Sequence, residues 1–360
     1  MHEHTLMVYV SAHGFGHWAQ VAPVLQHLHD RLPELRLVIR TALPDSLLRQ
    51  SISFPFIHLP GEMDIGVIQL DAMHEDIEAT RQAVSAFHQH WQSHVEEEAR
   101  LLHHYEAALV LSDIAPLGFA AAREAGIPSV GLCTLDWHDI YAPLFGIDFP
   151  PLEDIRAAHM DCTLLLKPPL CMPMQTFPRY KEIGLISRRS EADANATRTQ
   201  LGLLPEKNTA LIAFGGAGIP DFEVQALGEI PGWQFILPGQ PFGEDRLPDN
   251  VVSSDLHLYA MVDLLTAADC VVCKPGYGML AEAWTAGKPV AYVPRPAFPE
   301  YPFLKEWLDT QAPSQAFELL DFRRGNWLHT LQNLMTQQKT YPPLPTDGAI
   351  EAASLIAHML

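Results

Sequence analysis

Short apolar runs alternate with amphipathic stretches along the N-terminal half of the chain. Nearly continuous apolar runs, the pattern of strands buried on both faces of a parallel sheet, occupy residues 6–10, 35–41, 54–59, 108–111 and 129–133. Between them, apolar residues recur at helical spacing, and the longest predicted helix extends from about residue 73 to residue 105. This alternation predicts a parallel sheet covered by helices on both faces.

The C-terminal half repeats the alternation, with predicted strands at 209–214, 233–237, 270–273 and 290–293. The intervening stretch 143–178 is rich in proline and has a weaker pattern, although residues 162–166 resemble one more strand. We therefore predict an α/β protein with two Rossmann-like parallel-sheet domains that face each other across a cleft. The N-terminal domain is expected over residues 1–165 and the C-terminal domain over residues 166–340.

Two glycine-rich turns follow predicted strands. Residues 270–295 read as strand, turn, helix and strand, and Gly276 and Gly278 in that turn allow a ligand close to the backbone at a helix N-terminus, a place that attracts phosphate. Residues 11–17 follow the first strand, so His13 and His17 flank a glycine loop at a strand's carboxyl end. The third glycine of the dinucleotide fingerprint is missing there, which argues against hydride transfer.

Composition narrows the class of protein. The 360 residues carry a formal net charge of −20. They contain no basic stripe, because Arg188–Arg189 and Arg323–Arg324 are isolated pairs that we expect on the surface. A nucleic-acid partner is therefore not expected. No apolar run reaches the length of a membrane span, and no signal segment precedes the first strand, which favours a cytoplasmic protein. The five cysteines are expected as reduced core thiols. Cys270 and Cys273 have metal-ligand spacing but no second pair, so no metal site is predicted.

Four motifs together carry a resemblance to a known superfamily. These are H-G-F-G-H at 13–17, S-D-I-A-P at 112–116, F-G-G at 214–216 and K-P-G-Y-G-M-L-A-E at 274–282. The chain resembles the GT-B glycosyltransferases over essentially its whole length. It is most similar to the branch with the bacterial peptidoglycan N-acetylglucosaminyltransferase and the UDP-glycosyltransferases, and still more to bacterial proteins related to the glycosyltransferase-like N-terminal domain of L-arabinokinase.

The resemblance implies a division of labour between the domains. A nucleotide-sugar donor, expected to be UDP-linked, is held mainly by the C-terminal domain, and an acceptor is held mainly by the N-terminal domain. Neither a metal nor another cofactor is required. The apolar-periodic segment within residues 341–360 is expected to form a helix that crosses back onto the N-terminal domain.

The resemblance also implies roles for two residues of the N-terminal domain. His17 matches the family's catalytic base, and Asp113 matches the acidic residue that orients it. A carboxylate bound to one ring nitrogen fixes the tautomer of an imidazole and stabilises its protonated form. The alternative is that His17 and Asp113 cap helices, and His13 is a rival base or an acceptor contact.

The predicted donor site lies in the C-terminal domain. Gly215 and Gly216 would bring backbone amides to the diphosphate or ribose, while Lys274 would add a point charge to the turn formed by Pro275, Gly276, Tyr277 and Gly278. Glu282 resembles the acidic residue that accepts from the ribose hydroxyls, although an acid early in a helix also favours the helix dipole by itself. The long signature of the plant enzymes is absent, and Pro299–Glu300 is the nearest equivalent of its terminal Asp-Gln, so the identity of the donor stays open.

Two further segments are candidates for acceptor or loop contacts. Trp137, His138 and Asp139 follow the strand ending at Cys133, and together with Gly14, Phe15 and Gly16 they could form acceptor surface; the alternative is that Trp137 packs against the sheet. Arg295 and Glu300 bound a proline-rich loop that either covers the donor or is a plain connection.

We therefore predict a hexosyltransferase that moves a sugar from a nucleotide diphosphate to the hydroxyl of a small-molecule or lipid-linked acceptor. Two alternatives remain. One is epimerisation of a UDP-sugar on the same fold, which would need further carboxylates in the site. The other is a protein that binds a nucleotide sugar without turnover. Peripheral contact with a membrane is left open.

Overall fold

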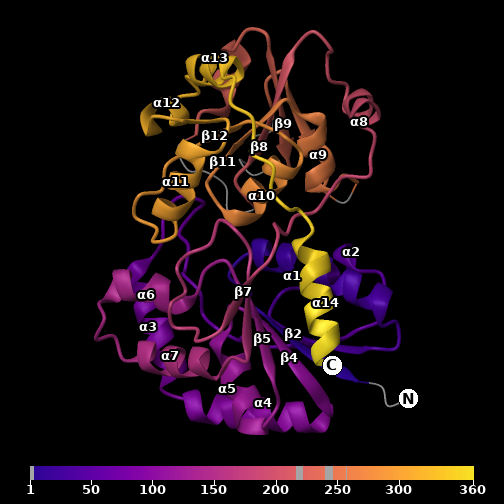
Figure 1. Ribbon diagram of the computed structural model, residues 1–360. Coiled ribbons are helices and arrows are strands. Elements are labelled where there is room, and N and C mark those ends of the chain that lie inside the picture. The colour runs from indigo at the N-terminus through magenta and orange to yellow at the C-terminus, as the bar shows by residue number, and fades with distance from the viewer. Residues whose placement is uncertain (1–3, 216–221, 240–245, 257) are drawn as a thin grey trace. The chain divides into compact units, whose positions relative to one another are not determined.

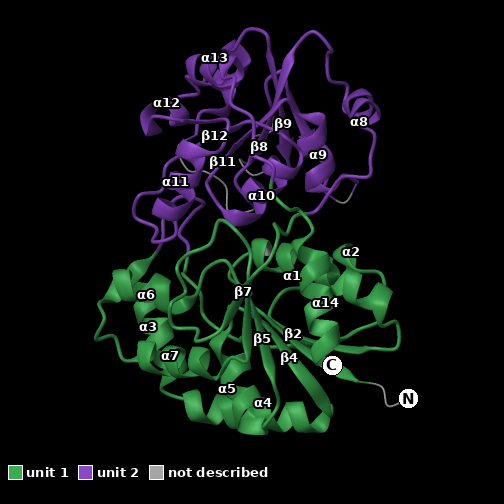
Figure 2. Cartoon of the chain, viewed as in Figure 1, with its two compact units in different colours: residues 1–68, 76–187, 344–360 green, residues 69–75, 188–343 purple. Residues whose placement is uncertain are grey.

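The computed structural model describes residues 4–215, 222–239, 246–256 and 258–360 of the chain. These residues divide into two compact units (Figure 2). Unit 1 contains the residues up to 68 together with 76–187 and 344–360, and unit 2 contains 69–75 and 188–343. Each unit is built on its own parallel sheet, so the prediction of two parallel-sheet α/β domains is confirmed.

Among the described residues, the sheet of unit 1 has seven strands, all paired in parallel. In spatial order they are β3 (Ile57–Pro60), β2 (Arg36–Thr41), β1 (Thr5–Val10), β4 (Ala107–Asp113), β5 (Ser129–Leu132), β6 (Leu164–Lys167) and β7 (Tyr180–Glu182). The helices are α1 (Phe15–Arg31), α2 (Asp45–Ser51), α3 (Ile77–His88), α4 (Trp91–His104), α5 (Pro116–Ala125), α6 (Trp137–Phe145), α7 (Pro151–Asp161) and α14 (Gly348–Met359).

Strand β1 shows why this sheet is covered on both faces. All of its residues are buried. Successive side chains of a strand point to opposite faces, so Leu6 and Val8 pack in a core with α1 and α14, while Met7 and Tyr9 pack in a second core with α4 and α5 (Figure 1). The C-terminal helix α14 therefore belongs to unit 1, where it lies against α1.

Unit 2 repeats the arrangement with six described strands, again all parallel. In spatial order they are β10 (Val251–Ser254), β9 (Trp233–Pro238), β8 (Asn208–Ala213), β11 (Cys270–Cys273), β12 (Val290–Tyr292) and β13 (Ser314–Ala316). The helices are α8 (Ala194–Gln200), the 3-10 helix η1 (Val224–Glu229), α9 (Met261–Ala267), α10 (Tyr277–Thr285), α11 (Tyr301–Thr310), α12 (Leu319–Arg323) and α13 (Leu328–Thr336).

The predicted helix from 73 to 105 is wrong. The chain instead forms α3 and α4, separated by Gln89 and His90. The segment that precedes them, 69–75, belongs to unit 2, where Ala72 is fully buried in the core. Residues 73–75 therefore leave the predicted helix, because the segment that contains them joins unit 2 rather than α3.

Unit 1 also continues further along the chain than expected. Residues 166–187 belong to it because β6 and β7 extend its sheet in parallel register. Strands β7, β10 and β13 were not predicted, since each has four residues or fewer and carries polar side chains on an exposed or edge position. Short strands of this kind lack a hydrophobic signal.

Both sheets contain a point at which the strand order reverses. In unit 1 this switch point lies between β1 and β4, and in unit 2 it lies between β8 and β11. Open α/β sheets bind ligands at the carboxyl ends of the strands beside such points. The candidate residues after β1, β4, β8 and β11 therefore lie where this architecture places a binding site.

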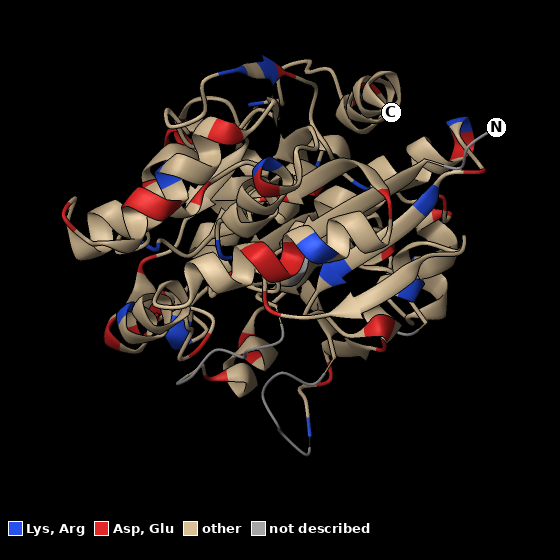
Figure 3. Cartoon of the chain, turned by 90° about the horizontal axis from the view of Figure 1, so that it is seen from below, with Lys and Arg blue, Asp and Glu red and all other residues tan. Residues whose placement is uncertain are grey.

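Two further observations concern partners. None of the helices in the described ranges is long and apolar enough to cross a lipid bilayer. Lys and Arg positions occur singly or in short groups among Asp and Glu positions in the view of Figure 3, in keeping with the formal net charge of −20.

Candidate functional site

His17 and Asp113 meet at the switch point of unit 1. His17 lies in the first turn of α1, and Asp113 is the last residue of β4. The two atoms His17 Nδ1 and Asp113 Oδ2 are 2.9 Å apart, and the side chains are 11% and 1% exposed. A neutral imidazole that carries its proton on Nδ1, the nitrogen nearer Asp113, has its acceptor lone pair on Nε2, which is the arrangement that a general base requires.

The backbone after β4 is shaped to present Asp113. Ile114 has a φ of 61°, a left-handed conformation that is rare for a β-branched residue. The Ile114 amide donates to Cys133 Sγ over 3.1 Å, and the Ala115 amide donates to the Asp113 carbonyl over 2.7 Å. Backbone strain of this kind persists only where surrounding contacts enforce it, and it concentrates at functional sites.

Neither residue acts as a helix cap. The N-cap residue of α1 is Gly14 and that of α5 is Ala115, and neither helix has a side-chain cap. The alternative in which His17 and Asp113 only cap helices is therefore wrong. Phe15 and Gly16 begin α1, next to the N-cap residue.

His13 lies beside this pair but has a different tautomer. Its Nδ1 accepts a hydrogen bond from the Val67 amide over 3.1 Å, so the neutral ring carries its proton on Nε2. The rings of His13 and His17 have centroids 6.2 Å apart. The two rings therefore differ in the partner of Nδ1: Nδ1 of His13 accepts from a backbone amide, whereas Nδ1 of His17 lies beside a carboxylate.

Asp64 is a site residue that the sequence reasoning missed. Its carboxylate accepts from Ser11 Oγ and from Trp137 Nε1, each over 2.9 Å. Burial raises the pKa of Asp64 to about 6, although the hydrogen bond from Trp137 and the nearby His17 oppose that rise. A usable signal existed, because Asp64 lies between two glycines, Gly61 and Gly66, in the loop after a predicted strand.

Trp137 does not offer a stacking surface. It is 1% exposed, stacks on Tyr141 with ring centroids 5.4 Å apart, and uses its indole N–H on Asp64. The cavity behind it measures about 10 Å³, room for about one water molecule. The structure therefore favours the packing alternative for Trp137.

His138 and Asp139 lie on the first turn of α6, with side chains 26% and 18% exposed. Asp136, the N-cap residue, accepts from the Asp139 amide over 2.8 Å, and Asp139 accepts from the Met174 amide over 2.8 Å. In the described part of the chain, Asp136, His138 and Asp139 place potential metal-ligand atoms within 4.8 Å of one another. Each carboxylate already accepts a backbone N–H group, and both residues lie at the positive N-terminal end of α6, which disfavours a cation.

In unit 2, the turn after β11 leads into the N-terminus of α10. Gly276 is its N-cap residue, and no side chain caps the helix. A Cβ added at Gly276 would meet no atom within 4 Å, so neither packing nor a positive φ requires glycine there, and space remains for a ligand. Gly278 lies in the first turn, while Pro275 and Tyr277 are buried. Gly215 follows β8 with a φ of 76°, and Gly216 lies outside the described residues.

Lys274 and Arg295 bring positive charge to this end of the sheet. Burial and the nearby Arg295 lower the pKa of Lys274 to about 8. Arg295 forms an ion pair with Glu75, and both side chains are 7% exposed. The guanidinium also lies over the Phe298 ring, 4.6 Å from its centroid. Glu75, which belongs to the segment 69–75, was missed because the sequence placed it on a helix of the other domain.

Glu282 is already engaged by a cation. Arg188 Nε lies 2.6 Å from Glu282 Oε1, and the carboxyl is 4% exposed. Burial raises the pKa of Glu282, and Arg188 opposes that rise. Arg188 is 36% exposed, as expected of a surface pair, but it also contacts a buried carboxylate, which the sequence did not indicate. Glu300, which is 6% exposed, is the N-cap residue of α11.

Comparisons with known proteins found a curated relative and several solved structures that are similar to this chain. No family model matches the chain. The chain is 27% identical over 358 residues to L-arabinokinase of Arabidopsis thaliana, an alignment that covers 98% of this chain and 34% of that protein. The chain thus spans about a third of the length of this curated relative.

Several solved glycosyltransferases have similar structures. The glycotransferase of kitacinnamycin matches with a TM-score of 0.69 and 16% identity over 100% of both chains. A UDP-glucosyltransferase from Polygonum tinctorium matches with a TM-score of 0.65 and 13% identity over 99% of this chain and 98% of that one. Spinosyn rhamnosyltransferase in complex with thymidine diphosphate matches with a TM-score of 0.60 and 15% identity over 99% and 95%. The chain therefore has the GT-B fold.

Proposed function

We propose that this protein is a glycosyltransferase that moves a sugar from a nucleotide diphosphate to an acceptor hydroxyl. The observation that carries the proposal is the 2.9 Å contact between His17 Nδ1 and Asp113 Oδ2 at the switch point of unit 1. The fold shared with solved glycosyltransferases and the similarity to L-arabinokinase support it.

The proposed reaction uses His17 as base. The acceptor O–H gives its proton to His17 Nε2, and its oxygen forms a bond to the anomeric carbon of the donor sugar. The bond from that carbon to the diphosphate oxygen breaks, and the diphosphate leaves with the electron pair. Asp113 stabilises the imidazolium that results, and a single displacement of this kind inverts the anomeric centre.

Unit 2 is proposed to bind the donor and stabilise the leaving group. The amides at the N-terminus of α10 supply a partial positive charge, and Lys274 adds an ammonium charge at the same end of the sheet, where Arg295 is paired with Glu75. Because these groups can offset the diphosphate charge, we propose that the reaction needs no metal. A hexosyl group, a UDP-linked donor and a cytoplasmic location complete the proposal.

The test is incubation of the protein with UDP-sugars and TDP-sugars, each with and without a mixed panel of alcohol, phenol and sugar acceptors. Mass spectrometry should detect a glycosylated acceptor or slow hydrolysis of one donor, at an unchanged rate with a metal chelator. His17→Ala should lower kcat by about a thousandfold and leave diphosphate binding unchanged. Full activity in His17→Ala would refute the assignment of the base.

One observation favours a second candidate, an epimerase that acts on a nucleotide sugar. Epimerisation needs further carboxylates near the reacting carbon, and Asp64 lies close enough to His17 and Asp113 for their charges to act on it. The same incubation separates the candidates, because an epimerase converts the donor into its epimer without an acceptor. Tight nucleotide binding with no product of either kind would instead indicate a binding protein.

A further inference from the structure

The loop after β3 is fastened to two neighbouring elements through Asp64 and Gly66. Ser11 Oγ, in the turn before α1, donates to Asp64 Oδ1, and Trp137 Nε1, in α6, donates to Asp64 Oδ2. Tyr141, also in α6, donates its hydroxyl to the Gly66 carbonyl over 2.8 Å. Ser11 and Trp137 are 0% and 1% exposed, so the carboxylate is held by two buried donors in a defined position.

This position is beside the proposed base. The positive charge of protonated His17 and the negative charge of Asp113 both act on Asp64. The rings of His17 and Trp137, which binds Asp64, have centroids 6.4 Å apart. The titratable groups that face Asp64 come from several elements: His13 before α1, His17 on α1, Asp113 on β4, Tyr141 on α6 and His88 on α3.

These groups differ in what they can do for His17. His88 is already paired with Asp154, and burial lowers its pKa, while burial raises the pKa of Tyr141 well above its usual value. His88 and Tyr141 therefore stay neutral near pH 7. His13 presents a donor on Nε2. Asp64 and Asp113 remain as the carboxylates that act on His17.

We propose that Asp64 is a positioning residue for the proposed base and acts together with Asp113 on His17. When Asp64 is ionised, its negative charge makes the imidazole of His17 a stronger proton acceptor. This inference rests on the proposed function of His17. Its physical basis is that a negative charge near an imidazole favours the protonated ring. Protonation of Asp64 at lower pH removes that charge, so the strength of the base depends on the state of a neighbouring acid.

The direction of the effect follows from the charges. With Asp64 ionised, the pKa of His17 is higher than it would be beside a neutral residue. Asp64→Asn removes the charge and retains the shape, so the pKa of His17 should fall by about half a unit or more. In activity, the acidic limb of the kcat/KM profile should move to lower pH, and the plateau should fall about tenfold because the base is weaker.

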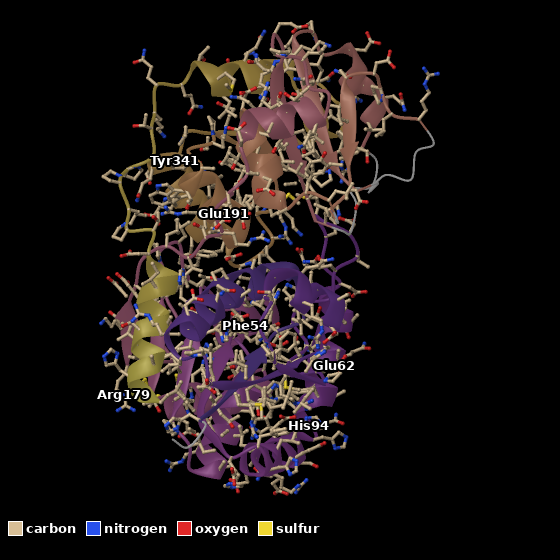
Figure 4. All side chains as sticks on the ribbon, turned by 90° about the vertical axis from the view of Figure 1, so that its right-hand side faces the viewer. Phe54, Glu62, His94, Arg179, Glu191 and Tyr341 are labelled. Carbon is tan, nitrogen blue, oxygen red and sulfur yellow. The ribbon has the colours of Figure 1, made fainter. Side chains whose placement is uncertain are left out.

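The direct experiment is an NMR titration of the His17 ring in the full chain without substrate, with His17→Gln to assign the signal. Asp64→Asn is compared with Glu62→Gln, a matched control two residues away whose exposed carboxylate lies at the surface of unit 1 (Figure 4). Ser11→Ala serves as a second variant, because loss of its hydroxyl leaves the Asp64 carboxylate in place with one donor fewer. We expect the midpoint of His17 to fall most in Asp64→Asn, less in Ser11→Ala, and not in Glu62→Gln.

The outcomes distinguish this inference from the proposed function. An unchanged midpoint of His17 in folded Asp64→Asn and Ser11→Ala overturns the inference, even if the protein transfers sugar with His17 as base. A shifted midpoint in a protein that turns over no nucleotide sugar supports the coupling and rejects the transferase. A uniform loss of activity without movement of the acidic limb identifies Asp64 as merely structural and also overturns the inference.

Discussion

The two units pair their buried carboxylates with different basic side chains. In unit 1, the buried carboxylate of Asp113 contacts an imidazole, His17, and in unit 2, the buried carboxylates of Glu282 and Glu75 contact guanidinium groups, Arg188 and Arg295. An imidazole exchanges its proton near neutral pH, whereas a guanidinium does not. This difference is consistent with the proposed function, in which unit 1 carries out proton transfer and unit 2 holds the donor.

The turn after β4 in unit 1 and the turn before α10 in unit 2 also differ. Unit 1 holds Asp113 with a left-handed Ile114 that the surrounding contacts enforce, whereas unit 2 opens α10 with a glycine that no packing requires. A fixed side chain suits a reaction that depends on the position of one proton. An open backbone turn suits the approach of a diphosphate.

The largest expected effect tests the contact between Asp113 and the imidazole of His17 in unit 1. Asp113→Asn should lower kcat by about a hundredfold to ten thousandfold, because an amide no longer fixes the tautomer of His17 or stabilises its charge. Asp154→Asn is the matched control, since His88 Nδ1 and Asp154 Oδ2 are also 2.9 Å apart and Asp154 is not among the proposed site residues. Steady-state kinetics should show little change in the control, and equal losses in both variants would remove the special role of Asp113.

The next effect concerns stability in unit 2. Glu75→Gln leaves the buried Arg295 charge without its partner, which should lower the free energy of unfolding by about 3 kcal/mol. Urea unfolding followed by circular dichroism measures this, with the exposed Glu78→Gln as control. A loss below about 0.5 kcal/mol would show that the ion pair does not hold the segment 69–75 in place.

Lys274 should give a smaller, pH-dependent effect. Its pKa of about 8 means that the ammonium group loses its charge as the pH rises through that value, so affinity for uridine diphosphate should fall between pH 7 and pH 9. Lys274→Met should weaken binding about tenfold at pH 7. Lys274→Arg should bind without this pH dependence, because arginine stays charged. Calorimetry measures all three, and the same pH dependence in Lys274→Arg would contradict the assignment.

The smallest effect tests the loop that carries Asp64. Gly66 has a φ of 70°, and a Cβ there would lie 2.7 Å from the ring of His13. Gly126 has a φ of 72° with nothing within 4 Å, so Gly126→Ala measures the backbone cost alone, about 1 kcal/mol. Gly66→Ala should cost more in urea unfolding and should also raise the KM for the acceptor. Equal costs would mean that the ring of His13 moves aside freely.

Much of the fold could be predicted from the chain because parallel strands buried on both faces are continuous apolar runs. Residues 270–273 were predicted as a strand with the bounds that β11 has, and the predicted strands 6–10 and 35–41 each differ by one residue from β1 and β2. The position of His17 after such a run was also visible, and the resemblance added Asp113, which the strand order brings close to it. The resemblance supplied their roles, which local periodicity does not contain.

Only the tertiary structure decided the contacts between residues that lie far apart in the chain. Asp64 lies 73 positions from Trp137, and Glu75 lies 220 positions from Arg295. No periodicity joins such pairs, because a strand or helix pattern reports only the face on which a residue lies, not what packs against that face. The sequence by itself determined the two parallel sheets and the strand ends at which this architecture places ligands. The tertiary structure decided which carboxylate meets which cation, through burial that only the folded chain creates.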